Sequence, residues 1–190
     1  GRQTNENRSV MKKVALFLLT LLLPLMVSAA YRTFQVDGIF YEQRDASDEF
    51  VNVTSTPEGI AKYAGDVVIP ASVTYNGKTY PVKKIGQWAF WECTGLKTIV
   101  LPEGLEEIEN SSFYGCTQLK AVTFPSTLKS LRGVEFSREK GAFEGCTGLK
   151  SVYFPASMLT DELWTANIGW ASFRDCTGLK TIFVAGSKTA

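Results

Sequence analysis

Four cysteines carry the most reactive side chains whose spacing repeats in this sequence. They occupy positions 93, 116, 146 and 176, so they are separated by 23, 30 and 30 residues. Zinc sites built on thiolates usually need close pairs such as C-x-x-C, and the chain has none. The chain also has no histidine, which is the usual general base and the partner in most nucleophilic triads. We therefore expect no metal site, no cofactor and no enzymatic activity.

Acidic residues offer the other candidate chemistry. Glu106 and Glu107 are adjacent in sequence, and we interpret them as solvated turn residues rather than an acid–base pair. The segment "DASDE", from Asp45 to Glu49, could hold a calcium ion, but it lacks the glycine and the closing glutamate of an EF-hand loop. A polar loop is the better interpretation. The net charge is +1 for the whole chain and −2 without residues 1–29, which hold four basic residues and one acidic residue. Such a near-neutral surface gives no support to nucleic-acid binding, which needs a clustered basic surface.

Each cysteine belongs to a copy of one phrase. The four copies read "CTGLKTIVLP", "CTQLKAVTFP", "CTGLKSVYFP" and "CTGLKTIFVA". A phenylalanine stands three residues before each cysteine and a leucine three residues after it: Phe90, Phe113, Phe143 and Phe173, then Leu96, Leu119, Leu149 and Leu179. A period of 20–29 residues with L-x-x-L-x-L spacing indicates a leucine-rich repeat. Two longer units carry seven extra residues, which lie between Leu131 and Ala142 and between Met158 and Ile168.

The segment "IGQWAFWECTGLKTIVLPEGLEEI" closely resembles the unit of the BspA-like leucine-rich repeat family, and the resemblance covers about Val67 to Val184. It implies a leucine-rich repeat solenoid, rich in β-structure, with one short parallel strand per coil and little helix. It also implies a bacterial surface protein, since some members are implicated in adhesion to host matrix proteins. Two departures stand out. The last unit ends "VAGSKTA", and Arg138 occupies the position where Ile85, Ile108 and Ile168 stand in the other units.

The repeat must position its cysteines inside the stack. A single unit cannot bury its own apolar edge, so neighbouring coils pack on one another, with a strand at Thr98 to Leu101 in the first. One equivalent cysteine per coil, beside a buried phenylalanine, predicts a ladder of small buried side chains. We favour free thiols at Cys93, Cys116, Cys146 and Cys176. Disulfides between adjacent coils remain the alternative, because an exported protein folds in an oxidising compartment.

Four regions follow along the chain. Residues 1–10 are polar upstream sequence, and residues 11–30 are expected to be a secretory signal peptide. Its apolar run has 14 residues and contains Pro24, whereas a membrane span needs about 20. Residues 31–66 are predicted to form a small N-terminal β cap, and residues 67–190 a solenoid of about four coils. Asp37-Gly38 and Asn76-Gly77 predict tight hairpins. We expect a secreted, cell-surface or periplasmic protein with no membrane span after signal removal.

The outward residues of the strands are the candidate binding surface. They form columns across the coils, of which the lysines and the aromatic residues are the strongest candidates: Lys120, Lys150, Lys180, Tyr153 and Phe183. The lysine row could instead be a solvated guard of the strand edges. A second candidate is the flank carrying the two insertions, with Phe136 and Trp164. We predict a protein-binding, adhesin-like module for an extracellular or host protein, with a structural spacer as the alternative.

Overall fold

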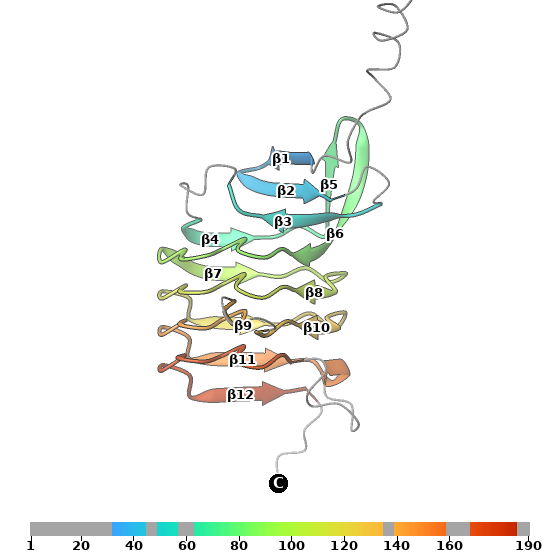
Figure 1. The fold of residues 1–190 in the computed structure, drawn as a ribbon. Helices are drawn as coiled ribbons and strands as arrows, with labels where there is room; N and C mark the ends of the chain where they lie inside the picture. Colours follow the sequence, from blue (N-terminus) through green and yellow to red (C-terminus); the bar gives the residue numbers. More distant parts are fainter. Residues whose placement is uncertain (1–31, 45–48, 57–62, 135–138, 159–167, 186–190) are drawn as a thin grey trace, which may run out of the picture.

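The computed structural model describes residues 32–44, 49–56, 63–134, 139–158 and 168–185. These residues form a β-solenoid of about four turns with almost no helix, beneath a small antiparallel cap (Figure 1). The predicted signal peptide, Arg138, Phe136 and Trp164 lie outside the described residues.

The cap begins with a hairpin whose strands are joined by two residues. β1 (Arg32–Val36) pairs antiparallel with β2 (Ile39–Gln43), and Asp37 and Gly38 between them have φ angles of 49° and 81°. Positive φ at both positions is what a tight hairpin turn of this kind requires, and Asp-Gly supplies it at low steric cost. The same geometry recurs at Asn76 and Gly77, with φ of 50° and 78°. Both hairpins indicated by the sequence are therefore present.

The cap is continuous with the solenoid. β2 pairs antiparallel with β3 (Val51–Thr54), and β3 then pairs parallel with β6 (Lys78–Ile85). β5 (Ser72–Tyr75) forms the second hairpin with the first half of β6. The Tyr63 hydroxyl connects cap and solenoid: it donates to Thr54 O and accepts from Phe40 N, both at 2.9 Å, while its ring lies 4.7 Å from that of Phe90.

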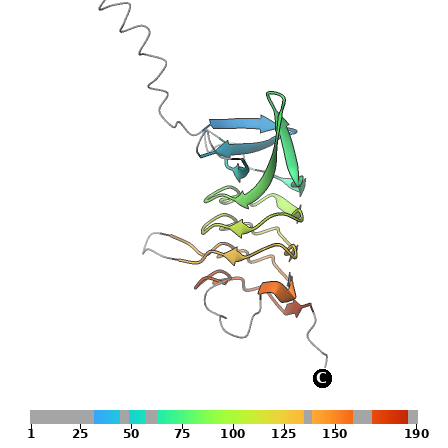
Figure 2. The same ribbon diagram turned by 90° about the vertical axis from the view of Figure 1, so that its right-hand side faces the viewer.

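Two stacks of short strands run along the solenoid (Figures 1 and 2). The first holds β4 (Gly65–Val68), β7 (Leu96–Val100), β9 (Ala121–Thr123), β11 (Ser151–Phe154) and β12 (Thr181–Val184). The pairs β4–β7, β9–β11 and β11–β12 are parallel, and β7 lies next to β9. The second stack holds the end of β6, then β8 (Glu107–Ile108) and β10 (Ser130–Leu131). A short 3-10 helix, η2 (Ala156–Met158), follows β11.

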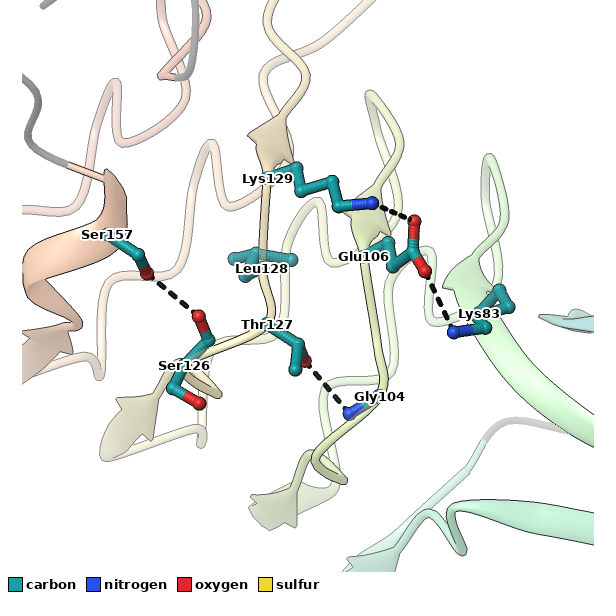
Figure 3. Close-up of a pocket in the computed structure, with 8 residues that line it drawn as sticks. All are labelled: Lys83, Gly104, Glu106, Ser126, Thr127, Leu128, Lys129 and Ser157. Carbon is teal, nitrogen blue, oxygen red and sulfur yellow. Dashed lines mark hydrogen bonds and ion pairs between the residues drawn. The ribbon is translucent and has the colours of Figure 1, made fainter.

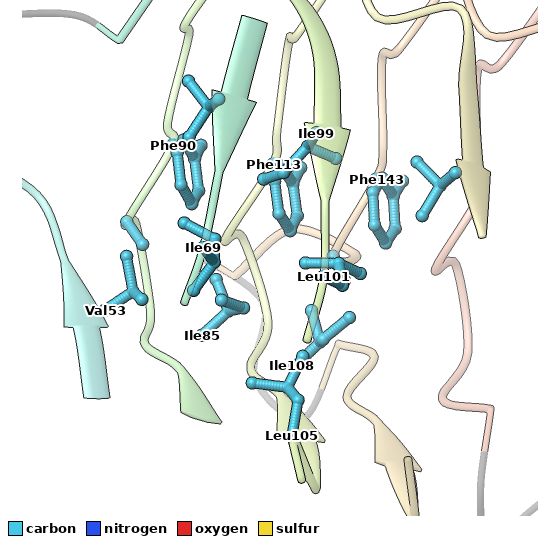
Figure 4. Close-up of a cluster of buried hydrophobic side chains, with 14 of the residues drawn as sticks. Val53, Ile69, Ile85, Phe90, Ile99, Leu101, Leu105, Ile108, Phe113 and Phe143 are labelled. Atoms are coloured by element: carbon cyan, nitrogen blue, oxygen red, sulfur yellow. The ribbon is translucent and has the colours of Figure 1, made fainter. Parts of the chain in front are cut away.

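The interior is a set of ladders in which each coil contributes one side chain. The rings of Phe90, Phe113 and Phe143 stack face to face, with centroid separations of 4.8 and 4.6 Å (Figure 4). Phe173 continues the stack at 5.5 Å from Phe143. A fully buried leucine follows six residues after the phenylalanine of each of three coils: Leu96, Leu119 and Leu149. Fully burying each such side chain contributes about 1.5–3 kcal/mol, and no single coil could provide the opposing surface.

The structure corrects the assignment of one position of the repeat. Leu131 pairs with Ile108 and forms a bridge with Ile168, so Leu131, and not Arg138, occupies the position of Ile85 in that coil. Leu131 is 1% exposed. The extra residues, which the sequence placed after Leu131, therefore follow the return strand, because pairing of β10 with β8 makes Leu131 part of that strand. This coil is as regular in its core as its neighbours.

The last described coil is only half covered. Ile182 is in register with Val152, which is fully buried, yet Ile182 is 58% exposed. Among the described strands, β12 pairs only with β11. Within the described residues, the inward side chains of this coil therefore have a paired strand on one side only.

Candidate binding surface on the strand face

The cysteines hold adjacent coils of the solenoid together. Each of three thiols donates a hydrogen bond to the carbonyl of the phenylalanine on the preceding coil: Cys116 to Phe90 and Cys146 to Phe113 at 3.1 Å, and Cys176 to Phe143 at 3.0 Å. All four cysteines are free and buried. Hydrogen bonding to the neighbouring Cys116 thiol, together with burial, raises the pKa of Cys146 above its ordinary value. Such thiols are poor nucleophiles, because the thiolate is the reactive form.

The strand face is the outward side of β4, β7, β9, β11 and β12. A row of lysines crosses it at the start of the strands, namely Lys97, Lys120, Lys150 and Lys180, all exposed. Lys150 N donates to Lys120 O at 2.7 Å, and Lys180 N donates to Lys150 O at 3.0 Å. The three predicted lysines are thus brought into register on adjacent coils.

This lysine row differs from the other lysines of the described chain. The five lysines elsewhere each form an ion pair: Lys78 with Glu49, Lys83 and Lys129 with Glu106, Lys84 with Glu107, and Lys140 with Glu144. No ion pair joins a lysine of the row to a described carboxylate. The one carboxylate at a described outward position of the five strands, Asp66, accepts a hydrogen bond from Thr98 at 2.7 Å. The row therefore carries four positive charges that no described ion pair neutralises, and Asp66, which keeps its charge beside the neutral Thr98 hydroxyl, is the one carboxylate on the same described face.

An apolar column crosses the same face three residues further along the strands. It consists of Val68, Val100, Thr123, Tyr153 and Phe183, whose apolar members are 62%, 52%, 39% and 45% exposed. Val68 pairs with Val100, and Tyr153 pairs with both Thr123 and Phe183. The rings of Tyr153 and Phe183 stack with centroids 4.4 Å apart and planes 8° apart. The two predicted aromatic residues therefore form one exposed platform.

Between these two columns lie small side chains. Thr98, Ala121, Ser151 and Thr181 stand at the intervening outward position of β7, β9, β11 and β12, and Asp66 stands at that position of β4. The strand face thus presents larger cationic side chains on one side, larger apolar side chains on the other, and room between them.

The exposed Trp170 marks a second surface that the sequence reasoning missed. On the turns that precede the strands, Trp170 is 71% exposed, and Arg174 lies 5.8 Å above its ring. Arg174 also donates to the buried Glu144 at 2.6 Å. Further along these turns, the Trp91 ring stacks on Tyr114 at 4.3 Å. The charge of Arg174 is thus paired with Glu144, and the Trp91 ring is packed against Tyr114, whereas the lysines of the row form no described ion pair. A tryptophan at a repeat position otherwise occupied by polar residues was the available sequence signal.

Val68 was also missed as a member of the apolar column. The signal was present, because "VVIP" at 67–70 matches "IVLP" at 99–102 and places Val68 beside Val100. Phe136 and Trp164, the alternative predicted flank, remain outside the described residues.

A cleft of about 520 Å³ lies on the return side of the solenoid, lined by eight residues (Figure 3). Glu106 stands at its edge between Lys129 at 2.6 Å and Lys83 at 2.8 Å, and these hydrogen bonds lower its pKa to about 2. Thr127 accepts from Gly104 N and donates to Leu105 O. The charges of Glu106, Lys83 and Lys129 and the Thr127 hydroxyl are therefore all paired within the protein. These contacts hold neighbouring coils together, and we interpret the cleft as structural and not as a binding site.

Neither a metal centre nor a membrane helix emerges from the part of the chain that the structure describes. Within that part, no group of three or more His, Cys, Asp or Glu residues is placed to hold a metal ion. No helix there has the length and apolar character needed to cross a bilayer.

Comparison with known proteins identifies the family of the repeat and finds similar solved structures. Residues 70–189, more than half of the chain, match the family described as "BspA type Leucine rich repeat region", in six copies. A leucine-rich repeat protein from Bacteroides capillosus ATCC 29799 has a similar structure, with a TM-score of 0.60 and 27% identity over 81% of this chain and 99% of that one. Another, from Bacteroides ovatus ATCC 8483, has a TM-score of 0.50 and 23% identity over 79% of this chain and 40% of that one. No curated protein matches the sequence significantly.

Proposed function

Because the chain belongs to the BspA-type leucine-rich repeat family, we propose that it is an exported module whose strand face binds an extracellular or host protein. The residues expected to make the contact are Lys120, Lys150, Lys180, Tyr153 and Phe183. Export would proceed through the signal peptide at residues 11–30, to a secreted, cell-surface or periplasmic location.

The stacked pair of Tyr153 and Phe183 carries this proposal. Two aromatic rings that pack on each other are held in place, so binding them costs little further side-chain entropy. Both keep more than a third of their surface in water, and they continue a column of exposed valines. Contiguous exposed apolar residues favour contact with a protein, and aromatic residues contribute a large share of the binding free energy in protein interfaces.

Binding also agrees better than catalysis with the chemistry of the described residues. All four thiols are buried, and three of them donate to backbone carbonyls. The carboxylates of Glu106, Glu107 and Glu144 are each held by two cations. Solenoids commonly use the exposed surface of their strand stack for recognition.

A binding screen with matched variants tests the proposal. The chain from residue 31 onward would be immobilised and exposed to a panel of extracellular-matrix proteins by surface plasmon resonance. For any protein that binds, the double variant Tyr153→Ala, Phe183→Ala should raise the Kd at least tenfold with little change in thermal midpoint, because both residues face solvent. Trp170→Ala, an exposed aromatic residue off the strand face, is the control. Loss of binding in the control alone would overturn the assignment to the strand face.

A further inference from the structure

We propose that the partner presents an acidic amphipathic helix, which lies along the solenoid axis over the small-residue column of the strand face. This inference rests on the proposed function and names the chemistry of the partner at the same site.

The lysine row supplies the charge argument. Lys97, Lys120, Lys150 and Lys180 have no described carboxylate partner, whereas every described lysine off the row has one. Four cations on adjacent coils, about 4.8 Å apart at their backbones, repel one another in the free protein. A partner that places carboxylates beside them removes that repulsion and gains attraction, so complementarity favours an acidic partner.

The apolar column requires that the partner be more than a polyanion. Val68 and Val100 are the most exposed members of the column, and an aliphatic side chain gains binding free energy only by burial against other apolar groups. Tyr153 and Phe183 extend the same column over the last two coils. The partner therefore carries an apolar stripe beside its acidic stripe, which favours a protein segment over an acidic polysaccharide.

The spacing of the columns favours a helix. The lysine and apolar columns are three residues apart along each strand, or about 10 Å, and an α-helix with its side chains is about 10–12 Å across. The small residues between the columns, from Thr98 to Thr181, leave room for the helix backbone.

The spacing between coils favours a helix that lies along the solenoid axis. A helix rises about 5.4 Å per turn, close to the coil spacing of about 4.8 Å, so over three coil steps the two drift apart by only about 2 Å. Lysine side chains can absorb that difference. Alternate residues of an extended strand are about 6.7 Å apart and would drift by about 6 Å over the same length.

A designed peptide tests the inference on the chain from residue 31 onward. The probe is an 18-residue alanine-based helix with a glutamate stripe and an adjacent leucine stripe, labelled for fluorescence anisotropy. We expect saturable binding that weakens at least tenfold when Lys120, Lys150 and Lys180 are all changed to glutamate, and that weakens as salt is raised. Lys129→Glu, which reverses one exposed lysine off the face, should change the Kd less than twofold.

Competition and peptide controls decide between the alternatives. A peptide with lysine in place of glutamate, or with two central prolines, should bind at least tenfold more weakly; equal binding by either would overturn the acidic or the helical part of the inference. Stronger binding of heparin than of the probe would overturn it in favour of a polysaccharide, and no binding of the probe to the wild-type chain would overturn it outright.

The same variants distinguish this inference from the proposed function. If a matrix protein binds through Tyr153 and Phe183 but is unaffected by the lysine reversals, the acidic partner is wrong and the strand face remains the binding site. If neither set of variants weakens a protein that binds the wild type, both proposals are wrong.

Discussion

The thiol of Cys146 donates a hydrogen bond to the backbone carbonyl of Phe113, 3.1 Å away on the preceding coil. Cys116 and Cys176 repeat this contact with Phe90 and Phe143. The Phe113 carbonyl also accepts from Cys116 N at 3.2 Å within its own coil, so the repeated cysteine supplies a second donor that joins adjacent coils.

The first prediction concerns these thiols. Because all four are buried and free, Ellman's reagent should titrate none of them in the native protein and four after denaturation in guanidinium. Cys146→Ala should lower the free energy of unfolding by about 1–3 kcal/mol, since it removes one of the two donors to Phe113 O and leaves a small cavity. Fewer than four thiols in the denatured, unreduced protein would reveal a disulfide.

The second prediction tests the corrected repeat position. Leu131→Ala should lower the free energy of unfolding by about 2–5 kcal/mol, as expected for truncating a fully buried leucine. Arg138→Ala, at the position that sequence spacing alone assigned to the core, should change it by less than about 0.5 kcal/mol. Urea denaturation followed by tryptophan fluorescence measures both. The reverse ranking would restore the sequence-based alignment.

The third prediction is a pH dependence at Glu106. Its folded-state pKa is about 2, below its ordinary value of 4.5, because Lys129 and Lys83 donate to the charged form. The stabilisation is therefore present above about pH 4.5 and is lost as the pH falls toward 2. The side chain is one-third exposed, so its contribution is about 1 kcal/mol or less, or a few degrees in thermal midpoint.

Comparison with Glu106→Gln isolates that contribution. The wild type should melt above the variant at pH 6, and the gap should close by pH 2, as followed by circular dichroism. A gap that stays constant between pH 6 and pH 2 would contradict the lowered pKa.

The fourth prediction concerns export. When the chain is expressed from Met11 in a bacterial host with a Sec pathway, intact-mass spectrometry of the exported fraction should find an N-terminus near Ala30 or Tyr31. Replacing Leu18, Leu19 and Leu21 with arginine should keep the precursor in the cytoplasm, because the translocation machinery requires an apolar segment. Membrane-embedded protein that still begins at Met11 would contradict cleavage.

The sequence by itself determined the repeat and most of its core. A solenoid repeats one local environment in every coil, so a residue needed at one position recurs, and the alignment on cysteine identifies Phe113, Leu149 and their equivalents without coordinates. Asp37-Gly38 and Asn76-Gly77 determined their hairpins because few other residue pairs tolerate positive φ at both positions. These features depend on local or periodic chemistry.

Only the tertiary structure decided which residue fills a shared position when the spacing changes. Sequence spacing placed the seven extra residues after Leu131 but assigned Arg138 to the position of Ile108, whereas pairing of Leu131 with Ile108 gives that position to Leu131. Only the structure could also show whether the lysines of the row form ion pairs. Sequence shows four lysines at one repeat position, but only the packing of the coils shows that the carboxylates pair with other cations and leave this row without a described ion pair. Contacts between distant residues, which no local pattern encodes, set both outcomes.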